Sequence, residues 1–436
     1  MSNPLAKLLK VIPPGTHLVI GGTMILGAAS YVQTSITGHA FTGDPKQALA
    51  ELWTLVMTVS LGLFFPIEQE LTRVVAARAV RGEGVAPVLR RAALLTLGLL
   101  VVIGAVLAAA AGPLADTFFG HDRSLVWVLG AALAGMALVY LTRGILAGLG
   151  LFNAYGVSLG LDGLLRILLA GGLYLAGSTS AVEYGLVLAI APLVAMVCTL
   201  PTTLRGCRPG PTMPWGELFQ NMTMMICASV LAQLVVNAAV ITTALVTVDK
   251  DLSFALLTAG MLCRVPLFVF GSLQPTLMTG LSSTATAGDR AGFRKMLLQT
   301  CAVIGGLGLL GTLGAVVAGP WVTSVLMGAK DLLGAMDFFW FSIGTMCYML
   351  AMVLGQALLA LGRHSRQMTA WLLGTAVLAG VTLVPGPVAT RVEVAYAFGS
   401  LVTAIFMLLT LVRGISRQPS DPLTHGSAAA STLENA

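Results

Sequence analysis

Long apolar stretches separated by short polar loops recur along the whole chain. Each is 17 to 27 residues long, and about 20 apolar residues cross the hydrocarbon core of a membrane as a helix. There are twelve, at residues 17–37, 48–67, 92–112, 125–149, 155–176, 182–204, 222–246, 252–278, 296–317, 338–361, 368–384 and 394–412. The pattern predicts an all-α, polytopic integral membrane protein with about 12 transmembrane helices.

The composition agrees with a chain that lies mostly in lipid. Hydrophobic residues make up 57% of the 436 residues and charged residues only 10%, whereas a soluble domain carries about 25% charged residues. This deficit excludes a cytosolic enzyme. The chain also has 50 glycines, which suit the close packing of helices in a membrane.

The basic residues predict the orientation of the chain. An even number of spans places both termini on one side, and 16 of the 24 Lys and Arg residues fall on that side, five opposite and three within spans. The positive-inside rule then puts both termini in the cytoplasm, with the protein in the plasma membrane. The formal charge of +6 is explained by this asymmetry, and we expect no nucleic-acid partner.

The two halves of the sequence resemble each other. Gly82-Glu83 and Gly288-Asp289 each follow a span containing proline and precede a basic pair, at an offset of 206 residues. RGILAGLG from Arg143 likewise matches GQALLALG from Gly355 at an offset of 212. Two matches at similar offsets indicate a parallel duplication of six helices. The expected organisation is an N-terminal six-helix lobe (1–204), an inter-lobe linker (205–216), a C-terminal six-helix lobe (217–417) and a disordered cytoplasmic tail (418–436).

Three arginines fall at membrane depth, where charged groups are costly and commonly functional. Arg264 has no acidic residue near it on its own span, so a group on another helix, water or a ligand must stabilise its charge. The candidate ion-pair partners on other helices are Asp337 and Glu70. Arg166 follows Asp162 by four residues, the spacing of a helical ion pair. Arg143 lies near a span end and can either bind a ligand or extend to the membrane surface.

Other polar residues accompany these charges. Two carboxylates, Glu68 and Glu70, follow Pro66 at the end of the second span, where they can act in gating or bind a coupling cation; alternatively, Glu70 pairs with Arg73 at a solvated helix end. Asp162 is a third candidate for that role. Amide side chains inside helices commonly form interhelical hydrogen bonds; those that can support a site here are Gln233, Asn237, Gln274 and Gln356.

Motifs for enzyme chemistry are absent from the sequence. It contains no phosphate-binding G-x-x-x-x-G-K-[ST] loop, no HExxH and no spaced Cys/His cluster. Almost all of the six cysteines lie in apolar stretches, and none has metal-ligand spacing, so we interpret them as small buried residues. We therefore expect a non-enzymatic protein without a cofactor or metal.

Three stretches resemble a known family. RVPLFVFGSLQPTLMTGLSSTATAGDRAGFRKML from Arg264, RGILAGLGLFNAYGVSLGLDGLLRILL from Arg143 and PIEQELTRVVAARAVRGEG from Pro66 are similar to the polysaccharide-exporter branch of the multidrug/oligosaccharidyl-lipid/polysaccharide superfamily, which includes Wzx-type flippases. The PIEQEL form, the alanine content and the abundant arginine resemble actinobacterial members. The resemblance implies a MATE-like, alternating-access transporter that moves a polyprenyl-diphosphate-linked glycan between leaflets. Membrane lipids, glycan polymerases and glycosyltransferases are its expected partners.

Three functions are compatible with the sequence. In a flippase, Arg264, Arg166 and Arg143 bind the diphosphate, because guanidinium groups match phosphate oxygens. In a cation-coupled multidrug or metabolite antiporter of the same fold, acidic groups line the cavity and the arginines are paired away from it. A membrane glycan polymerase or ligase would carry catalytic residues on outside loops. The sign of the charge facing the central cavity distinguishes the first two.

Overall fold

The computed structural model describes residues 15–41, 44–212, 215–237, 250–326 and 333–415, and these ranges are almost entirely helical, with no strand among them. The helices are α2 (Thr16–Ala40), α3 (Asp44–Val59), η1 (Ser60–Phe64), α4 (Phe65–Val80), α5 (Ala86–Ala109), α6 (Ala111–Phe118), α7 (Arg123–Gly148), α8 (Phe152–Leu175), α9 (Ala181–Gly206), α10 (Trp215–Val236), α12 (Lys250–Cys263), α13 (Val265–Thr286), α14 (Arg290–Trp321), η2 (Val322–Leu326), α15 (Ala335–Ala360), α16 (His364–Thr382) and α17 (Val388–Ile415).

The helices have the length and surface of membrane spans. Within the described ranges, ten are long and apolar enough to cross a bilayer. Each of the twelve predicted spans overlaps a helix, and residues 238–246 of the seventh span lie outside the described part. Large apolar side chains of α5 such as Leu97 and Val101 are exposed, as expected for a surface that faces lipid rather than water. The all-α, polytopic prediction is confirmed.

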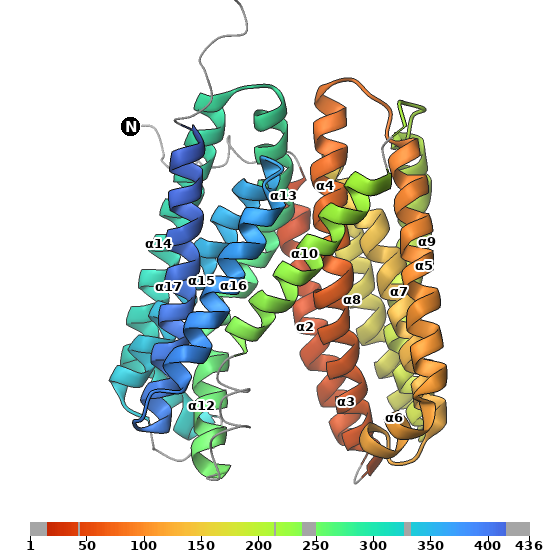
Figure 1. Cartoon of the computed structure of the whole chain (residues 1–436). Coiled ribbons are helices and arrows are strands. Elements are labelled where there is room, and N and C mark those ends of the chain that lie inside the picture. The colour runs from red at the N-terminus through yellow and green to blue at the C-terminus, as the bar shows by residue number, and fades with distance from the viewer. Residues whose placement is uncertain (1–14, 42–43, 213–214, 238–249, 327–332, 416–436) are drawn as a thin grey trace, which may run out of the picture.

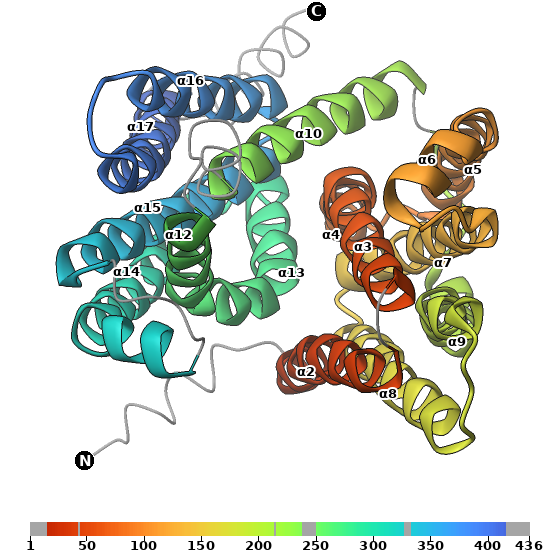
Figure 2. The ribbon, with the colours of Figure 1, turned by 90° about the horizontal axis from the view of Figure 1, so that it is seen from below.

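The helices form two bundles, seen side by side in Figure 1 and from one end in Figure 2. We call α2–α9 the N-lobe and α10–α17 the C-lobe. In the N-lobe α2 packs on α8 and α7 packs on α9, while in the C-lobe α15 packs on α14 and α17. Each lobe has its own large cluster of buried apolar side chains. The lobes meet mainly through α4 and α13.

Glycine brings α2 and α8 into backbone contact. A Cβ atom added at Gly156 would overlap the backbone of Leu18, and one added at Gly22 would overlap the carbonyl oxygen of Gly156. Small residues permit such close approach of membrane helices. The packing of α2 on α8 therefore depends on the missing side chain at these two positions.

Two of the predicted spans are interrupted, and in each case proline lies beside the interruption. The second span does not end at residue 67: α3, the π-helical turn η1 and α4 follow one another to Val80. Pro66 lies in the first turn of α4, and because proline lacks an N–H group the preceding turn loses a hydrogen bond. The Leu61 carbonyl in η1 accepts a hydrogen bond from Ser229 Oγ of α10 at 3.1 Å.

The eighth predicted span, residues 252–278, is divided into two helices. α12 ends at Cys263 and α13 begins at Val265, so Arg264 occupies the break between them. Pro266 lies in the first turn of α13, where its missing N–H costs nothing because that turn has no intrahelical acceptor. The break therefore places a charged residue at a helix start and not within a helix.

Part of the predicted linker is fixed to the N-lobe. α9 extends to Gly206, and residues 207–212 then lie against the turn between α4 and α5, at the upper right of Figure 1. Arg78 Nη1 donates hydrogen bonds to the Gly84 carbonyl at 3.1 Å and to the Pro211 carbonyl at 2.7 Å. The Ala86 amide donates to the Arg208 carbonyl at 3.0 Å. This segment is therefore held by the lobe that precedes it.

Candidate functional site

The N-lobe contains a buried cluster of charges centred on Asp162. Arg166 Nε donates a hydrogen bond to Asp162 Oδ1 at 2.9 Å, and Arg143 Nη2 donates to Asp162 Oδ2 at 3.0 Å. Arg143 also donates to the hydroxyl and the carbonyl of Ser158, at 3.2 and 3.1 Å. All four side chains are buried. One carboxylate thus binds two guanidinium groups inside the lobe.

The spacing of residues on α8 builds this cluster. Tyr155, Ser158, Asp162 and Arg166 recur at three- and four-residue intervals, so they share one face of the helix. That face meets α7, which supplies Arg143, and α4, which supplies Glu68. The Tyr155 hydroxyl donates a hydrogen bond of 2.6 Å to Glu68 Oε1. Glu68 is buried and forms no ion pair with another described residue.

Glu70 joins the two lobes. Its carboxylate, fully buried, accepts two hydrogen bonds from Arg73 on the same helix, at 2.7 and 2.8 Å. From the C-lobe, His364 Nε2 lies 2.9 Å from Glu70 Oε2 and Asn221 Nδ2 donates to Oε1 at 3.2 Å. We call Glu70, Arg73, Asn221 and His364 the inter-lobe latch. The contacts of Glu70 with Asn221 and His364 exist only while α4 lies against α10 and α16.

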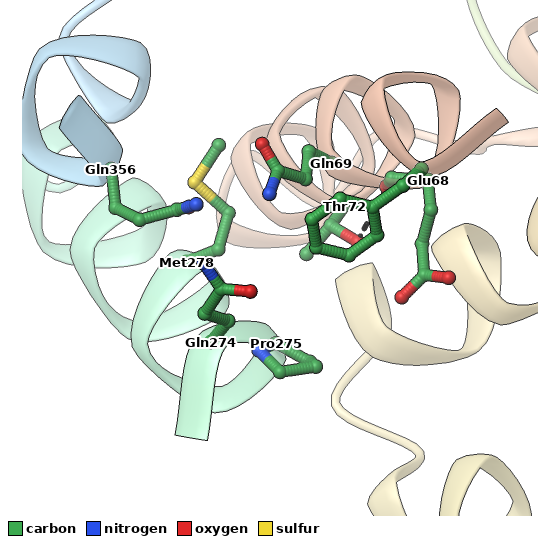
Figure 3. A pocket seen from close by; sticks show the side chains of 8 residues that line it. Glu68, Gln69, Thr72, Gln274, Pro275, Met278 and Gln356 are labelled. Atoms are coloured by element: carbon green, nitrogen blue, oxygen red, sulfur yellow. Dashed lines mark hydrogen bonds between the residues drawn. The ribbon is translucent and has the colours of Figure 1, made fainter. Parts of the chain in front are cut away.

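A small cavity lies at the seam between α4 and the C-lobe helices α13 and α15. Its volume of about 10 Å³ is room for roughly one water molecule. Gln274 Nε2 and Gln356 Oε1 are buried there without a hydrogen-bond partner among the described residues. In Figure 3 Gln69 points across the seam towards Met278, whereas the Glu68 carboxylate is directed away from the two C-lobe amides. The lining residues are Phe65, Glu68, Gln69, Thr72, Gln274, Pro275, Met278 and Gln356.

Arg264 belongs to a separate polar group in the C-lobe. Its Nη1 donates to Asn237 Oδ1 at 3.2 Å, and Asn237 Nδ2 donates to the Gln233 carbonyl at 2.9 Å. Arg264 is partly buried, and its Nε has no hydrogen-bond partner in the described ranges. Its contact is with an amide, not with the acidic partners that the sequence suggested, Asp337 and Glu70. The guanidinium charge is therefore not cancelled by a described carboxylate.

The residues chosen from the sequence thus fall into three groups. Arg143, Arg166 and Asp162 come together in the N-lobe, with Glu68 joined through Tyr155. Glu70, Gln274 and Gln356 lie at the seam between the lobes. The third group, Arg264, Asn237 and Gln233, lies in the C-lobe. The three arginines do not converge on one cavity, and the Arg143 partner is a carboxylate within its own lobe.

Several residues of these groups were not chosen from the sequence. Ser158 and Tyr155 lie one and two turns before Asp162 on its helix face, a spacing that identifies them once Asp162 is chosen. His364 and Asn221 lie near helix starts, where polar residues are common, so only the fold reveals their contact with Glu70. Among the described residues no group of three or more His, Cys, Asp or Glu side chains is placed to hold a metal ion.

Comparison with known proteins finds relatives of similar length. No protein-family model matches the chain. An uncharacterized protein of Mycobacterium bovis is 27% identical over 428 residues, covering 92% of this chain and 96% of its own length. An uncharacterized protein of Mycobacterium tuberculosis is 26% identical over 370 residues, covering 81% of this chain and 82% of its own.

Solved structures match the fold across nearly the whole chain. A MATE transporter of Vibrio cholerae superimposes with a TM-score of 0.78 at 12% identity, covering 92% of this chain and 96% of its own. A multidrug resistance MATE transporter in an outward-facing conformation has a TM-score of 0.71 at 15% identity, with coverages of 92% and 95%. A multidrug/oligosaccharidyl-lipid/polysaccharide superfamily transporter of Pyrococcus furiosus, described as having a binding pocket of reversed polarity, gives 0.73 at 16%, with coverages of 92% and 94%.

These similarities define the class of the protein at the level of architecture. The chain is a multi-pass membrane protein with the fold of MATE transporters. The MATE-like architecture expected from the sequence is confirmed.

Proposed function

We propose that this protein is an alternating-access transporter that exchanges a small organic solute for a cation. The observation that carries the proposal is the placement of charge. Arg143 and Arg166 are bound to Asp162 within the N-lobe, whereas Glu68 lines the cavity at the seam. Arginines paired away from the cavity and an acidic residue among its lining residues are the arrangement expected of a cation-coupled antiporter. The solved MATE transporters of the same fold support this choice over the flippase.

Glu68 is the residue we assign to cation coupling. A buried carboxylate without an ion-pair partner is costly in its charged form, so binding a proton or a metal cation stabilises it. Tyr155 supplies one hydrogen bond and leaves the remaining lone pairs of Glu68 available. Asp162 is already neutralised by two guanidinium groups. In this proposal Asp162 keeps the two arginines in place, and Glu68 binds and releases the coupling cation.

Alternating access requires the inter-lobe latch to open. The lobes meet at the end of the molecule where residues 207–212 lie, and the distribution of basic residues predicts that this end is cytoplasmic. The structure then corresponds to the form that is closed towards the cytoplasm. Opening on that side separates Glu70 from His364 and Asn221 and exposes Gln274 and Gln356 to solvent.

A second function, the flipping of a polyprenyl-diphosphate-linked glycan, is favoured by one observation. The Arg264 guanidinium is held by an amide and leaves Nε without a partner among the described residues, so it retains donors for a phosphate oxygen. Of the three arginines that the sequence assigned to the diphosphate, Arg264 alone has no carboxylate partner among the described residues. Glycan polymerases, glycosyltransferases and membrane lipids are the partners that this function would require.

Transport by the purified protein in vesicles tests the two functions together. Under an imposed proton or sodium gradient, we expect vesicles containing the wild-type protein to accumulate ethidium, a fluorescent organic cation. Glu68→Gln removes the coupling carboxyl and is expected to reduce gradient-driven accumulation by at least tenfold. Glu183→Gln, a change of the same kind at an exposed carboxylate on α9, is the matched control and is expected to transport normally.

Translocation of a fluorescent lipid-linked oligosaccharide, measured in the same vesicles, provides the results that would contradict the antiporter proposal. Translocation of that lipid by the wild type and its loss in Arg264→Ala, without ethidium accumulation, would replace the antiporter by the flippase. Full gradient-driven activity in Glu68→Gln would remove Glu68 from the mechanism.

A further inference from the structure

A second, much larger pocket lies between the first turns of α5 and the segment that follows α9. Its volume is about 500 Å³, within the range of small-ligand sites. We call it the linker pocket. It is distinct from the seam cavity, since the two share no described lining residue. The lining residues are Ala86, Pro87, Arg90, Arg91, Leu94, Pro209, Gly210 and Thr212.

The linker pocket is basic. Among the described residues that line it, Arg90 and Arg91 are the charged ones. Arg90 is exposed and forms no hydrogen bond or ion pair with another described residue. The nearest carboxylate in the α4–α5 turn, Glu83, is bound to Arg81 at 2.8 Å and does not line the pocket. The guanidinium group of Arg90 therefore favours an anion, and its planar donors suit phosphate oxygens.

One wall of the same pocket is apolar and continues along the membrane. Leu94 lines the pocket and is 48% exposed, and further along α5 Leu97 and Val101 are 58% and 65% exposed. Only 17% of the apolar stretch of α5 is buried by protein, so this face contacts lipid chains. A ligand with an anionic head and a hydrocarbon tail satisfies both parts of the surface.

We propose that the linker pocket binds the phosphate headgroup of an anionic phospholipid, with its acyl chains lying along α5. Basic pockets at the membrane surface bind such headgroups through their charge. The pocket is half built from residues 209–212, which Arg78 and the Ala86 amide hold against the N-lobe. A lipid bound between Arg90 and this segment adds to the contacts of Arg78 and the Ala86 amide, and so helps to hold residues 209–212 against the N-lobe. This inference is independent of which solute is transported.

Lipid binding to the purified full-length protein in neutral detergent tests the proposal. The probes are phosphatidylglycerol, phosphatidylcholine and inorganic phosphate, and the readouts are native mass spectrometry and thermal stability. We expect phosphatidylglycerol to bind and to raise the midpoint of thermal unfolding, and the double variant Arg90→Ala/Arg91→Ala to bind it roughly 10- to 30-fold more weakly. Thr212→Trp, which fills the pocket without changing charge, is expected to weaken binding as well.

The duplicated half of the chain provides the matched control. Arg294 and Lys295 form the corresponding basic pair at the start of α14, and both are exposed. Arg294→Ala/Lys295→Ala removes the same charge and is expected to leave phosphatidylglycerol affinity unchanged. Equal losses in the two double variants would overturn the proposal, because they would show general attraction to a basic surface. Stabilisation by inorganic phosphate alone, equal to that by phosphatidylglycerol, would overturn the assignment to a lipid.

Discussion

At the scale of single residues, the stability of the N-lobe depends on one buried carboxylate that binds two guanidinium groups. Asp162 is fully buried and is bound to Arg143 and Arg166. Removing one partner from a buried charged group leaves the others uncompensated, which costs about 3–5 kcal/mol. Because two guanidinium groups depend on one carboxylate, Asp162 is the member whose loss leaves the most charge unbalanced.

Asp162→Asn is therefore expected to destabilise the folded protein by about 3–5 kcal/mol. The amide keeps the shape and one acceptor oxygen but removes the negative charge between two cations. The fraction of monodisperse protein remaining after heating, measured by size-exclusion chromatography, reports the change. Asp116→Asn, at an exposed carboxylate paired with His121, is the control, and a surface pair of this kind contributes at most about 1 kcal/mol. Equal stability of the two variants would contradict the structural role of Asp162.

The sequence predicted contacts within a helix better than contacts between helices. The pairing of Arg166 with Asp162 follows from a spacing of four residues and is observed. For Arg143 the sequence left two interpretations open, ligand binding and extension to the membrane surface. Its partner lies on another helix, and no local sequence pattern predicts how that helix is rotated about its axis. Glu393 is a buried carboxyl that was missed, since the twelfth span was set to begin one residue after it. Hydropathy places boundaries to within a few residues, and Glu393 falls inside that error.

At the scale of elements, the two helices that face each other across the seam are both interrupted. η1 separates α3 from α4, and Arg264 separates α12 from α13. The sequence offset of the duplication, 206 residues, relates Arg264 to a position two residues before η1. Interrupted helices at membrane depth are tolerated where they line a cavity or are covered by protein. Here the Ser229 hydroxyl of the opposite lobe covers one of the freed carbonyls.

Gly156→Ala is expected to weaken the packing of α2 on α8, because the added Cβ atom would overlap the backbone of Leu18. Forced separation of two packed elements costs about 1–3 kcal/mol, so the thermal midpoint of the protein in detergent is expected to fall. Gly171→Ala on the same helix meets no atom within 4 Å and is expected to be neutral or slightly stabilising, since alanine is the better helix former. A fall of similar size in both variants would contradict this account.

Hydropathy alone was enough to locate the spans, because every helix that contacts lipid must be apolar over its length. It was not enough to predict the interruptions. The residues around Arg264 are apolar on both sides and Pro266 is compatible with a kinked continuous helix. Likewise α4 continues to Val80 beyond its apolar part, because protein rather than lipid surrounds Glu70 and Arg78.

At the scale of the whole molecule, the arrangement of the lobes is held by few directed contacts. Among the described residues, the latch at Glu70, the hydrogen bond from Thr279 Oγ1 to the Ala147 carbonyl at 2.8 Å and that from Ser229 Oγ to the Leu61 carbonyl at 3.1 Å cross between the lobes. Hydrogen bonds to charged groups contribute about 1.5–3 kcal/mol each. A conformational equilibrium held by contacts of this size shifts by a factor of ten or more when one is lost.

His364→Ala is expected to shift the equilibrium towards separation of the lobes at the latch by roughly tenfold. Spin labels at Val80→Cys and Ala287→Cys, two exposed positions near that end of the N-lobe and the C-lobe, report the distance by electron resonance in a variant whose native cysteines are replaced. The latch variant is expected to populate a longer distance than its parent.

Glu83→Gln supplies the comparison, since Glu83 contacts Arg78 and Arg81 within the N-lobe only. It is expected to leave the distance distribution unchanged. A distribution in His364→Ala identical to that of its parent would mean that the His364 contact does not hold the lobes together.

The interruptions also have a mechanical consequence. A helix with an intact backbone ladder is stiff along its length, whereas a π turn or a break acts as a joint. α3 and α12 lie on the far side of these joints from α4 and α13, at the lower end of Figure 1. The far halves can therefore swing while α4 stays bound to α10 and α16 through Glu70. The end of the molecule that carries α3 and α12 can therefore widen while the inter-lobe latch stays closed. Opening then consists of two separate motions and not of one rigid-body rotation of the lobes.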